Sequence, residues 1–182
     1  MSDPHAAITR RLGLLGAEST GKTTLADALA RTLDAFIAEE YLRDFVRDYG
    51  RLPTLADQEG IFLTQQATVS TVLRAAVHAG VPWIIADPLP LMTAVYSIVY
   101  FDDDSLLPMG MADAGDYDLL VWCAPDFAGA PEPGMRDGDS IRQRTDEVIA
   151  DRIAPHLPLL RVTGDAESRV SLIRTHLDTM GA

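Results

Sequence analysis

The stretch Gly16-Ala17-Glu18-Ser19-Thr20-Gly21-Lys22-Thr23 decides the fold of this chain. It has the form Gly-x-x-x-x-Gly-Lys-Thr, with a short apolar run at residues 12–15 before it and leucines at helical spacing after it. A strand that enters such a loop and a helix that leaves it surround an anion with backbone amides and with the positive end of the helix. We therefore predict that residues 16–23, here called the phosphate loop, bind the phosphates of a nucleoside triphosphate.

Each part of the phosphate loop has a physical role in this prediction. Gly16 and Gly21 permit backbone angles that side chains forbid. Lys22 is expected to reach the β- and γ-phosphates, and Thr23 to place its hydroxyl on Mg²⁺. Lys22 is the only lysine of the chain, beside fourteen arginines, and a compact ammonium fits inside a phosphate-wrapped loop better than a planar guanidinium does. The expected ATP-binding residues are Gly16, Ala17, Glu18, Ser19, Thr20, Gly21, Lys22, Thr23 and Thr24.

Length and composition exclude several classes of protein. The 182 residues suit one domain, residues 1–182, and the formal net charge of −12 disfavours binding to nucleic acid or to an anionic membrane surface. We find neither an apolar stretch long enough to span a bilayer nor a signal peptide, so we expect a cytoplasmic protein.

The single cysteine, Cys123, is expected to be a buried, inert thiol. The acidic trio Asp102-Asp103-Asp104 is expected to be a solvated loop and not a metal site.

Strand-like and helix-like segments alternate along the chain. Short apolar runs predict strands at residues 12–15, 35–38, 83–86, 119–123 and 159–162. Shorter helices are expected at residues 41–49, 91–101 and 168–180, and a charged helix is expected to end near residue 154. Five short apolar strands that alternate with helices predict an α/β fold, in which a five-stranded parallel sheet has helices on both faces.

The longest helix is expected to open at Pro53-Thr54 and to end at Gly80. Thr54 and Asp57 have the spacing of a capping box, in which the two residues satisfy each other's backbone amides. The apolar stripe of this helix is predicted to consist of Leu55, Phe62, Val69, Leu73 and Val77.

The sequence also favours one nucleotide. Proteins that select guanine normally carry an Asn-Lys-x-Asp element, and this chain contains no asparagine and no second lysine. We therefore expect ATP with Mg²⁺. The turn Thr163-Gly164-Asp165 follows the last predicted strand and is placed for backbone contacts to adenine, although a plain strand-to-helix turn is the alternative.

Acidic residues follow two of the predicted strands. Asp87 ends the third strand, and Glu39 and Glu40 end the second, so parallel pairing brings them to the edge that carries the phosphate loop. Asp87 is expected to hold Mg²⁺ or to accept a proton from an attacking hydroxyl, and a turn-forming Asp-Pro pair is the alternative. Glu40, with Arg43 one turn along, is expected to bind a substrate hydroxyl or to act as the base; capping of a surface helix is the alternative.

Arginines gather after the fourth predicted strand. Arg136, Arg142 and Arg144 fall within residues 125–144, which begin with a loop rich in proline and glycine. We expect this segment to be a mobile lid that neutralises charge on the transferring phosphoryl group and excludes water. The expected catalytic residues are Lys22, Asp87 and Arg136.

Together these segments resemble the ribosylnicotinamide kinase domain of NadR-type proteins and related small bacterial AAA-type P-loop ATP-binding proteins. The segments that carry the resemblance are the phosphate loop, Glu40-Tyr41-Leu42-Arg43-Asp44-Phe45-Val46, Asp87 with Thr93, Tyr117-Asp118-Leu119, Pro125-Asp126 and Gly134-Met135-Arg136. The resemblance implies a P-loop NTPase fold of the nucleoside or nucleotide kinase type, and ATP-dependent phosphorylation of a nucleoside such as nicotinamide riboside. It also implies that Lys22 and Thr23 serve ATP and Mg²⁺. The residues that it places toward the substrate or in the lid are Glu40, Arg43, Asp87 and Arg136.

The lid region departs from the pattern of that family. The family commonly has a Trp and acidic residues just before Gly-Leu-Arg, whereas Ala130-Pro131-Glu132-Pro133 precede Gly134-Met135-Arg136 here. One alternative function is therefore a regulatory ATPase or nucleotide-dependent switch that acts on a protein partner. Another is a phosphate-binding protein without turnover. The partner implied by the resemblance is a small nucleoside-like molecule.

Overall fold

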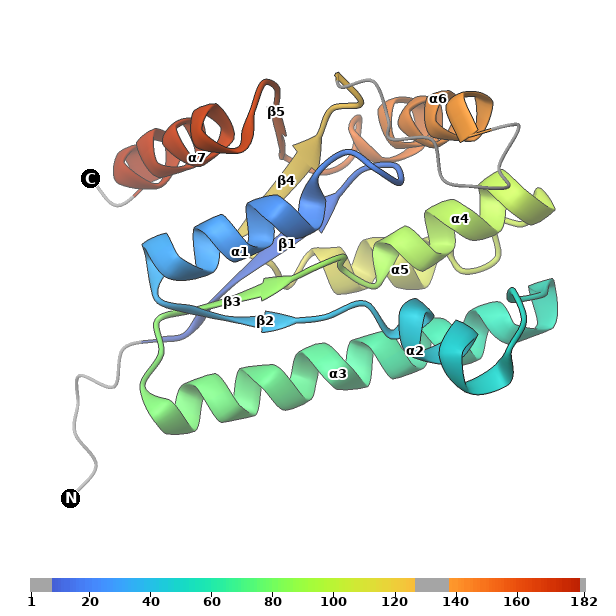
Figure 1. Ribbon diagram of the computed structural model, residues 1–182, viewed down its shortest axis with the longest axis horizontal. Coiled ribbons are helices and arrows are strands. Elements are labelled where there is room, and N and C mark those ends of the chain that lie inside the picture. Colours follow the sequence, from blue (N-terminus) through green and yellow to red (C-terminus); the bar gives the residue numbers. More distant parts are fainter. Residues whose placement is uncertain (1–7, 127–137, 181–182) are drawn as a thin grey trace.

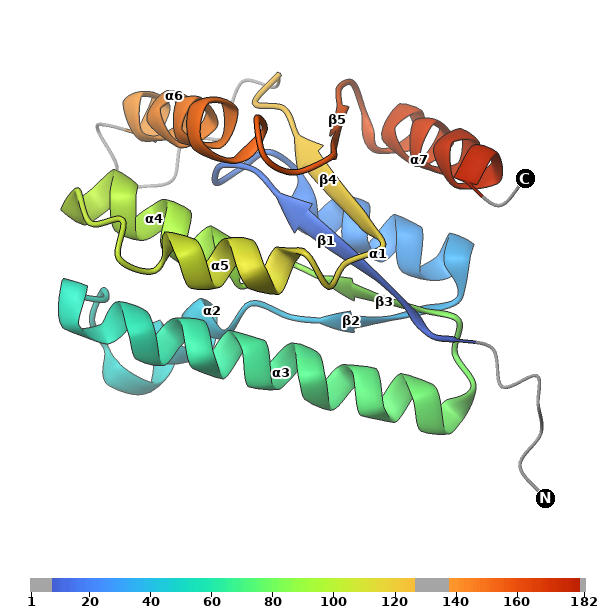
Figure 2. The ribbon, with the colours of Figure 1, turned by 180° about the vertical axis from the view of Figure 1, so that it is seen from behind.

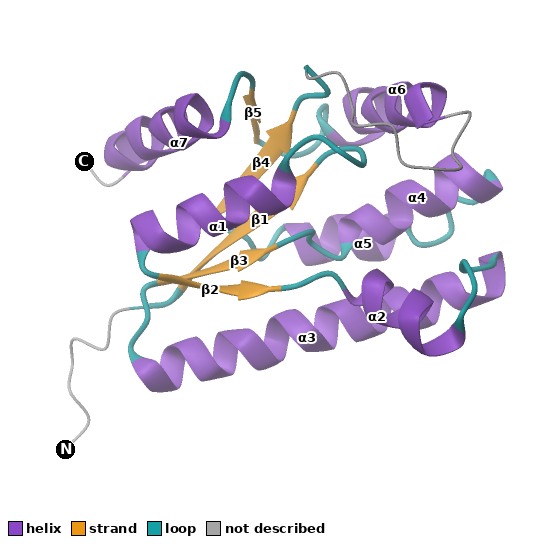
Figure 3. Ribbon diagram, viewed as in Figure 1, coloured by secondary structure: helices purple, strands orange, loops and turns teal. Residues whose placement is uncertain are grey.

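The computed structural model describes residues 8–126 and 138–180 of the chain. Five strands form one sheet: β1 (Arg10–Leu15), β2 (Ala35–Ala38), β3 (Trp83–Ala86), β4 (Leu119–Cys123) and β5 (Leu159–Val162). Every neighbouring pair is parallel, and the order across the sheet is β2-β3-β1-β4-β5, so that β1 lies at the centre. Because all strands run the same way, their carboxyl ends meet at one edge of the sheet (Figure 3).

Helices connect the strands. They are α1 (Lys22–Leu33), α2 (Tyr41–Tyr49), α3 (Gln58–Ala79), α4 (Leu91–Phe101), α5 (Leu107–Ala114), α6 (Gly138–Val148) and α7 (Ala166–Met180). A short 3₁₀ turn, Leu55–Asp57, precedes α3, and one π-helical stretch, Ile149–Ile153, continues α6. The predicted closing helix therefore begins two residues earlier than expected, and the predicted ranges of α2 and α4 are confirmed.

The helices form a layer on each face of the sheet. Figure 1 shows α1 and α7 in front of the strands, and their residues Leu25, Leu29 and Ile173 join Leu14 of β1 in one core. Figure 2 shows the opposite side, where α3, α4 and α5 cover the sheet and Phe62 joins Leu15 of β1 in a second core. Successive residues of a strand point to opposite faces. Accordingly β3 and β4 are apolar and buried along their whole length, and the predicted parallel sheet with helices on both faces is confirmed.

The apolar stripe predicted for the longest helix is wrong at both ends. Leu55 lies in the 3₁₀ turn before α3, where the Thr54–Asp57 capping box is present, and 48% of Leu55 is exposed. Val77 is 60% exposed, because it follows Val69 by eight residues and is turned roughly 80° around the helix axis from it. Ala76 takes the buried position instead. The buried face of α3 also contains two amide side chains, Gln58 and Gln65.

Helix α5 was not expected from the sequence, because Pro108 and Gly110 are poor helix formers. Pro108 lies in the first turn, where the backbone amide has no partner within the helix in any case. Gly110 permits α5 to approach α4 closely, since a Cβ atom there would lie 2.8 Å from Leu91 Cδ1. Packing between the two helices therefore overrides the local preference.

The acidic trio after α4 lies at the surface, as expected. Asp102 and Asp104 form exposed ion pairs with Arg144 and Arg152, at 3.5 and 2.9 Å. Asp103 accepts hydrogen bonds from Ser97 and Ser105. None of the helices in residues 8–126 and 138–180 combines the length and apolar character needed to span a membrane.

The core beneath α3 provides a test of the fold. Phe62 is fully buried in it, whereas the adjacent Leu63 is 46% exposed. We expect Phe62→Ala to lower the free energy of unfolding by about 3–5 kcal/mol, because it leaves a cavity in a packed core. Leu63→Ala, the matched control, is expected to change it by less than about 1 kcal/mol. Urea unfolding measures both, and equal effects would contradict the placement of α3.

Candidate active site

The phosphate loop leaves β1 at the centre of the sheet and leads directly into α1 (Figure 1). Gly16 has a φ of 142°, and a Cβ atom there would lie 2.7 Å from the Cys123 carbonyl oxygen of β4. Gly21 has a φ of 80° and precedes the first residue of α1. Both glycines therefore adopt backbone conformations that would be strained for a residue with a side chain. Thr20 is buried and donates its hydroxyl to the Ala17 carbonyl at 2.8 Å, which closes the loop on itself.

The ammonium group of Lys22 lies against this loop. Lys22 Nζ donates to the carbonyl oxygens of Gly16 at 2.8 Å and Ala17 at 2.6 Å. Burial lowers the pKa of Lys22, and nearby acidic groups partly oppose this shift. The side chain is therefore held where a phosphate could replace the carbonyl oxygens as its partner.

Three loops bring charged groups together next to Lys22. Arg43 Nη2 lies 3.3 Å from Thr23 Oγ1, and Arg43 Nε donates to Glu40 Oε2 at 3.3 Å. Asp87 lies close enough to Thr23, Lys22 and Arg43 for all three to lower its pKa. Lys22, Thr23, Glu40, Arg43 and Asp87 thus form one cluster at the carboxyl ends of β1, β2 and β3. Ser19 and Thr24 are exposed.

The two carboxylates of this cluster have raised pKa values. Desolvation is the main cause of the raised pKa of Asp87, and the Thr23 hydroxyl and the positive charges of Lys22 and Arg43 oppose it. Desolvation is also the main cause for Glu40, again opposed by Lys22 and Arg43. A raised pKa favours a carboxylate that takes up a proton during a reaction.

The Thr23 hydroxyl and the Asp87 carboxylate fit a magnesium ion. Mg²⁺ prefers oxygen ligands and is commonly held by one or two protein oxygens together with substrate phosphates. No group of three or more His, Cys, Asp or Glu side chains suited to a metal occurs in the described part of the chain. These residues therefore suit a magnesium site in which the oxygens of the triphosphate provide the remaining ligands.

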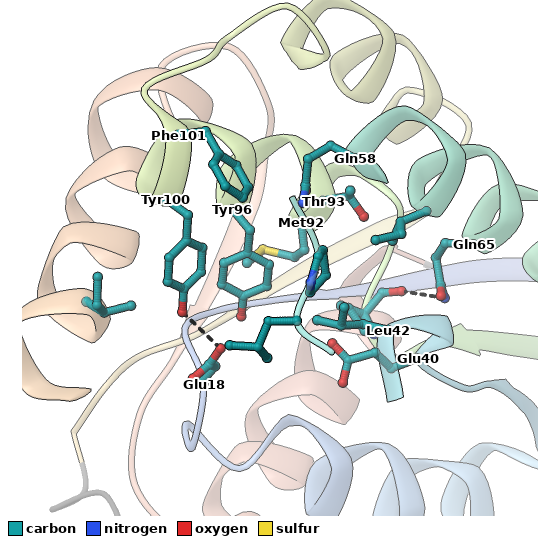
Figure 4. Close-up of a pocket in the computed structure, with 15 residues that line it drawn as sticks. Glu18, Glu40, Leu42, Gln58, Gln65, Met92, Thr93, Tyr96, Tyr100 and Phe101 are labelled. Carbon is teal, nitrogen blue, oxygen red and sulfur yellow. Dashed lines mark hydrogen bonds between the residues drawn. The ribbon is translucent and has the colours of Figure 1, made fainter. Parts of the chain in front are cut away.

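A cavity of about 510 Å³ opens beside the phosphate loop (Figure 4). Its walls come from the phosphate loop, the start of α2, the start of α3, helix α4 and one residue of α6. The polar and aromatic side chains that line it are Glu18, Glu40, Gln58, Gln65, Thr93, Tyr96, Tyr100 and Phe101. The cavity therefore shares Glu18 with the phosphate loop and Glu40 with the charged cluster.

Two tyrosines of α4 stand side by side in this cavity and point toward Glu18 (Figure 4). Tyr100 Oη donates to Glu18 Oε1 at 3.3 Å. Burial and the charge of Glu18 raise the pKa of Tyr100 to about 12, so its phenol remains protonated at neutral pH. The two rings, with centroids 6.1 Å apart and planes tilted by 41°, offer aromatic surface near an acidic group.

Gln65 is a site residue that the sequence analysis missed. Its Nε2 donates to the carbonyl oxygens of Glu39 and Pro88, both at 3.1 Å, and its Oε1 accepts from the Tyr41 amide at 2.7 Å. It therefore joins the loop that carries Glu40 to the loop that carries Asp87. An amide at a buried position of α3 was the available signal.

The predicted lid is only partly described. Arg136 lies outside the described residues. In the part of α6 that the structure describes, Arg144 forms its exposed ion pair with Asp102, and Arg142 pairs with Asp139 at 3.3 Å. The described contacts thus place neither Arg142 nor Arg144 on the phosphate loop. Cys123 is buried as expected, and burial raises its pKa to about 11.

The structure resembles several solved kinases. A NadR protein in complex with NR has a TM-score of 0.68 at 20% sequence identity, over 95% of this chain and 52% of that protein. A deoxyadenosine kinase from M. mycoides, with the products dCMP and dCDP bound, has a TM-score of 0.63 at 14% identity, over 93% and 99% of the two chains. A thymidylate kinase from Candida albicans has a TM-score of 0.59 at 12% identity, over 95% of this chain and 92% of that one. These likenesses show that the fold is that of P-loop nucleoside and nucleotide kinases.

Comparison of the sequence itself gives one family match. The chain spans about half the length of the NadR proteins that it matches. No curated protein matches the sequence significantly. A family model described as AAA domain matches residues 11–169, which is most of the 182 residues. The chain therefore belongs to this AAA domain family.

Proposed function

We propose that this protein is an ATP-dependent kinase that phosphorylates a hydroxyl group of a small nucleoside, with nicotinamide riboside as the candidate acceptor. The observation that carries the proposal is that the cavity opens onto the phosphate loop, with which it shares Glu18. A molecule in this cavity would lie next to the end of a bound triphosphate. Donor and acceptor would then meet in one enclosed space, as phosphoryl transfer requires.

The lining of the cavity favours a nucleoside over a nucleotide as acceptor. Among the described residues that line it, two carry carboxylates, Glu18 and Glu40, and none is Lys or Arg. A phosphate group on the acceptor would therefore meet two carboxylates, of which Glu40 is paired with Arg43 and Glu18 forms no ion pair among the described residues. A thymidylate kinase shares the fold, but this cavity is better suited to an uncharged or cationic molecule.

Nicotinamide riboside fits these requirements because its pyridinium ring is flat and positively charged. Such a ring is attracted to the faces of Tyr96 and Tyr100 and to the carboxylate of Glu18. A NadR protein with this fold binds NR, and another structure of NadR contains NAD and AMP-PNP. Those complexes support NR as the acceptor and ATP as the donor for this chain.

The residues of the cluster divide the reaction between them. Lys22 would neutralise the phosphate oxygens, and Thr23 and Asp87 would hold Mg²⁺, which supplies positive charge between the phosphates when bound. Because Glu40 lines the cavity proposed for the acceptor and Asp87 does not, Glu40 is the better candidate to accept the proton of the acceptor hydroxyl. Arg43 would orient Glu40 through their hydrogen bond. Arg136, Arg142 and Arg144 remain the proposed lid.

Activity with defined acceptors tests the proposal directly. With ATP and Mg²⁺, we expect the purified protein to phosphorylate nicotinamide riboside and to leave the corresponding 5′-monophosphate unmodified. A panel of other nucleosides serves as the comparison, with product formation followed by chromatography. The kinase function fails if no member of the panel is phosphorylated, and the argument from cavity charge fails if the monophosphate is the better acceptor.

Replacement of Lys22 tests the phosphate loop. We expect Lys22→Ala to lower kcat/KM for ATP by about 100-fold or more, because one positive group that stabilises the transferring phosphates is lost. The melting temperature should change little, since the ammonium contacts only loop carbonyls. Arg31→Ala, on the exposed last turn of α1, is the matched control and should keep full activity. Full activity of the Lys22 variant would exclude a role for this residue.

The pH dependence tests the role of Glu40. If Glu40 accepts the proton, only its ionised form is active, so the rate falls as pH drops through its pKa. Because burial raises this pKa, the loss should begin at a higher pH than for an ordinary glutamate. Glu40→Gln should lower kcat by about 100-fold or more and remove this acidic limb. The matched control is Glu39→Gln, which replaces an exposed neighbour, and an unchanged profile in the Glu40 variant would assign the base elsewhere.

A further inference from the structure

Arg169 is a buried charged residue at the start of α7. Its side chain is only 1% exposed, and it donates to groups on two different loops. Nη1 donates to the Thr20 carbonyl oxygen of the phosphate loop at 2.6 Å. Nη2 donates to the Ala124 carbonyl oxygen after β4 at 3.1 Å and to the Asp126 carboxylate at 2.6 Å. One guanidinium thus joins the phosphate loop to the loop that follows β4.

Asp126 extends this connection to a third loop. While one of its oxygens accepts from Arg169, the other accepts from the backbone amide of Gly164, in the turn after β5. Gly164 has a φ of 83°, a conformation that favours glycine. The same turn is continuous with α7, since Asp165 accepts from the Ser168 amide at 2.8 Å and from the Arg169 amide at 3.0 Å. The turn 163–165 is therefore held at both of its ends.

The contact with Thr20 constrains the phosphate loop itself. In a trans peptide unit, the carbonyl group and the following N–H group point in opposite directions. Because Arg169 holds the Thr20 carbonyl, the Gly21 amide must point away from Arg169. This amide stands at the start of α1, where backbone N–H groups bind anions.

A requirement of the core alone does not explain this arrangement. A buried ion pair is often no more stabilising than apolar residues of the same volume. Here the Arg169 guanidinium donates to carbonyl groups of two loops that border the proposed ATP site. Its partner Asp126 accepts from a backbone amide of a third loop. The partners point to a role in the relative placement of these loops.

We propose that Arg169 and Asp126 are positioning residues for the nucleotide. They hold the phosphate loop and the turn 163–165 in one fixed relative position. The phosphate loop would then bind the triphosphate of an ATP molecule while the turn contacts its adenosine part. This inference rests on the proposed binding of ATP. It makes the affinity of the phosphate loop depend on a carboxylate that does not belong to that loop.

Asp126→Asn is the decisive variant. An asparagine keeps one acceptor oxygen but presents an amide group to the second donor, and it removes the charge that balances Arg169. We expect the variant to bind both ATP·Mg²⁺ and inorganic tripolyphosphate about tenfold more weakly in calorimetric titration. Asp118→Asn is the matched control, because Asp118 also accepts from a backbone amide, that of Arg11, at the opposite edge of the sheet. Its affinities should be those of the unmodified protein.

A second variant, Arg169→Lys, separates positioning from folding. Lysine keeps the positive charge but cannot bridge the same set of acceptors, so we expect a folded protein with weakened binding of both ligands. In the kinase assay, both variants should raise KM for ATP and leave KM for the acceptor unchanged. Thermal unfolding of each variant establishes that the folded protein is measured.

Three results would overturn the inference. Unchanged affinity of the Asp126 variant for both ligands would show that the connection has no effect on binding. Weaker binding of ATP with unchanged binding of tripolyphosphate would show that the phosphate loop does not depend on Asp126, which contradicts the inference. Failure of the unmodified protein to bind ATP would remove the proposed function and the inference together. Inactivity toward every acceptor affects the kinase proposal alone, because the titrations contain no acceptor.

Discussion

The parallel direction of the five strands is the constraint on which the rest of this structure depends. Because every strand ends at the same edge, each connecting loop begins there. The first three loops deliver the phosphate loop, Glu40 and Asp87, and the last two deliver Asp126 and Gly164. An antiparallel strand at any of these places would carry its loop to the opposite edge. Side chains that are distant in sequence meet here without any distortion of the sheet.

The sequence was sufficient to predict the sheet because each strand contains a short run of apolar residues that is bounded by turns. The phosphate loop was predictable because its glycines and its lysine are required by local backbone geometry and by charge. The contacts of Arg169 were beyond such reasoning, since it and Thr20 are 149 positions apart and only the fold brings them together. Gln65 was missed because a search for apolar periodicity passes over an amide. Similarly, α5 forms because Gly110 packs against α4, and no local preference reports that contact.

The charge distribution at the site is uneven in a way that suits transfer between two different molecules. Lys22 and the start of α1 provide the positive environment for phosphates, whereas Glu18 and Glu40 make the adjoining cavity acidic. Opposite environments thus lie within one enclosed space, and Arg43 lies between them through its contacts with Thr23 and Glu40. The net charge of −12 adds a general repulsion of anions, so the attraction for phosphates must be local.

The solitary lysine has a practical consequence. Lys22 is the only side-chain amine in the sequence, and its lowered pKa increases the fraction present as the neutral, nucleophilic form. An amine-directed reagent therefore has one side chain to modify, and that side chain contacts the loop proposed to hold the nucleotide. Acylation of this position becomes a measure of occupancy, which mass spectrometry of the peptide that contains Lys22 can follow without a known acceptor. Because every other basic side chain except histidine is an arginine, the extent of acylation at Lys22 reports whether the nucleotide site is occupied.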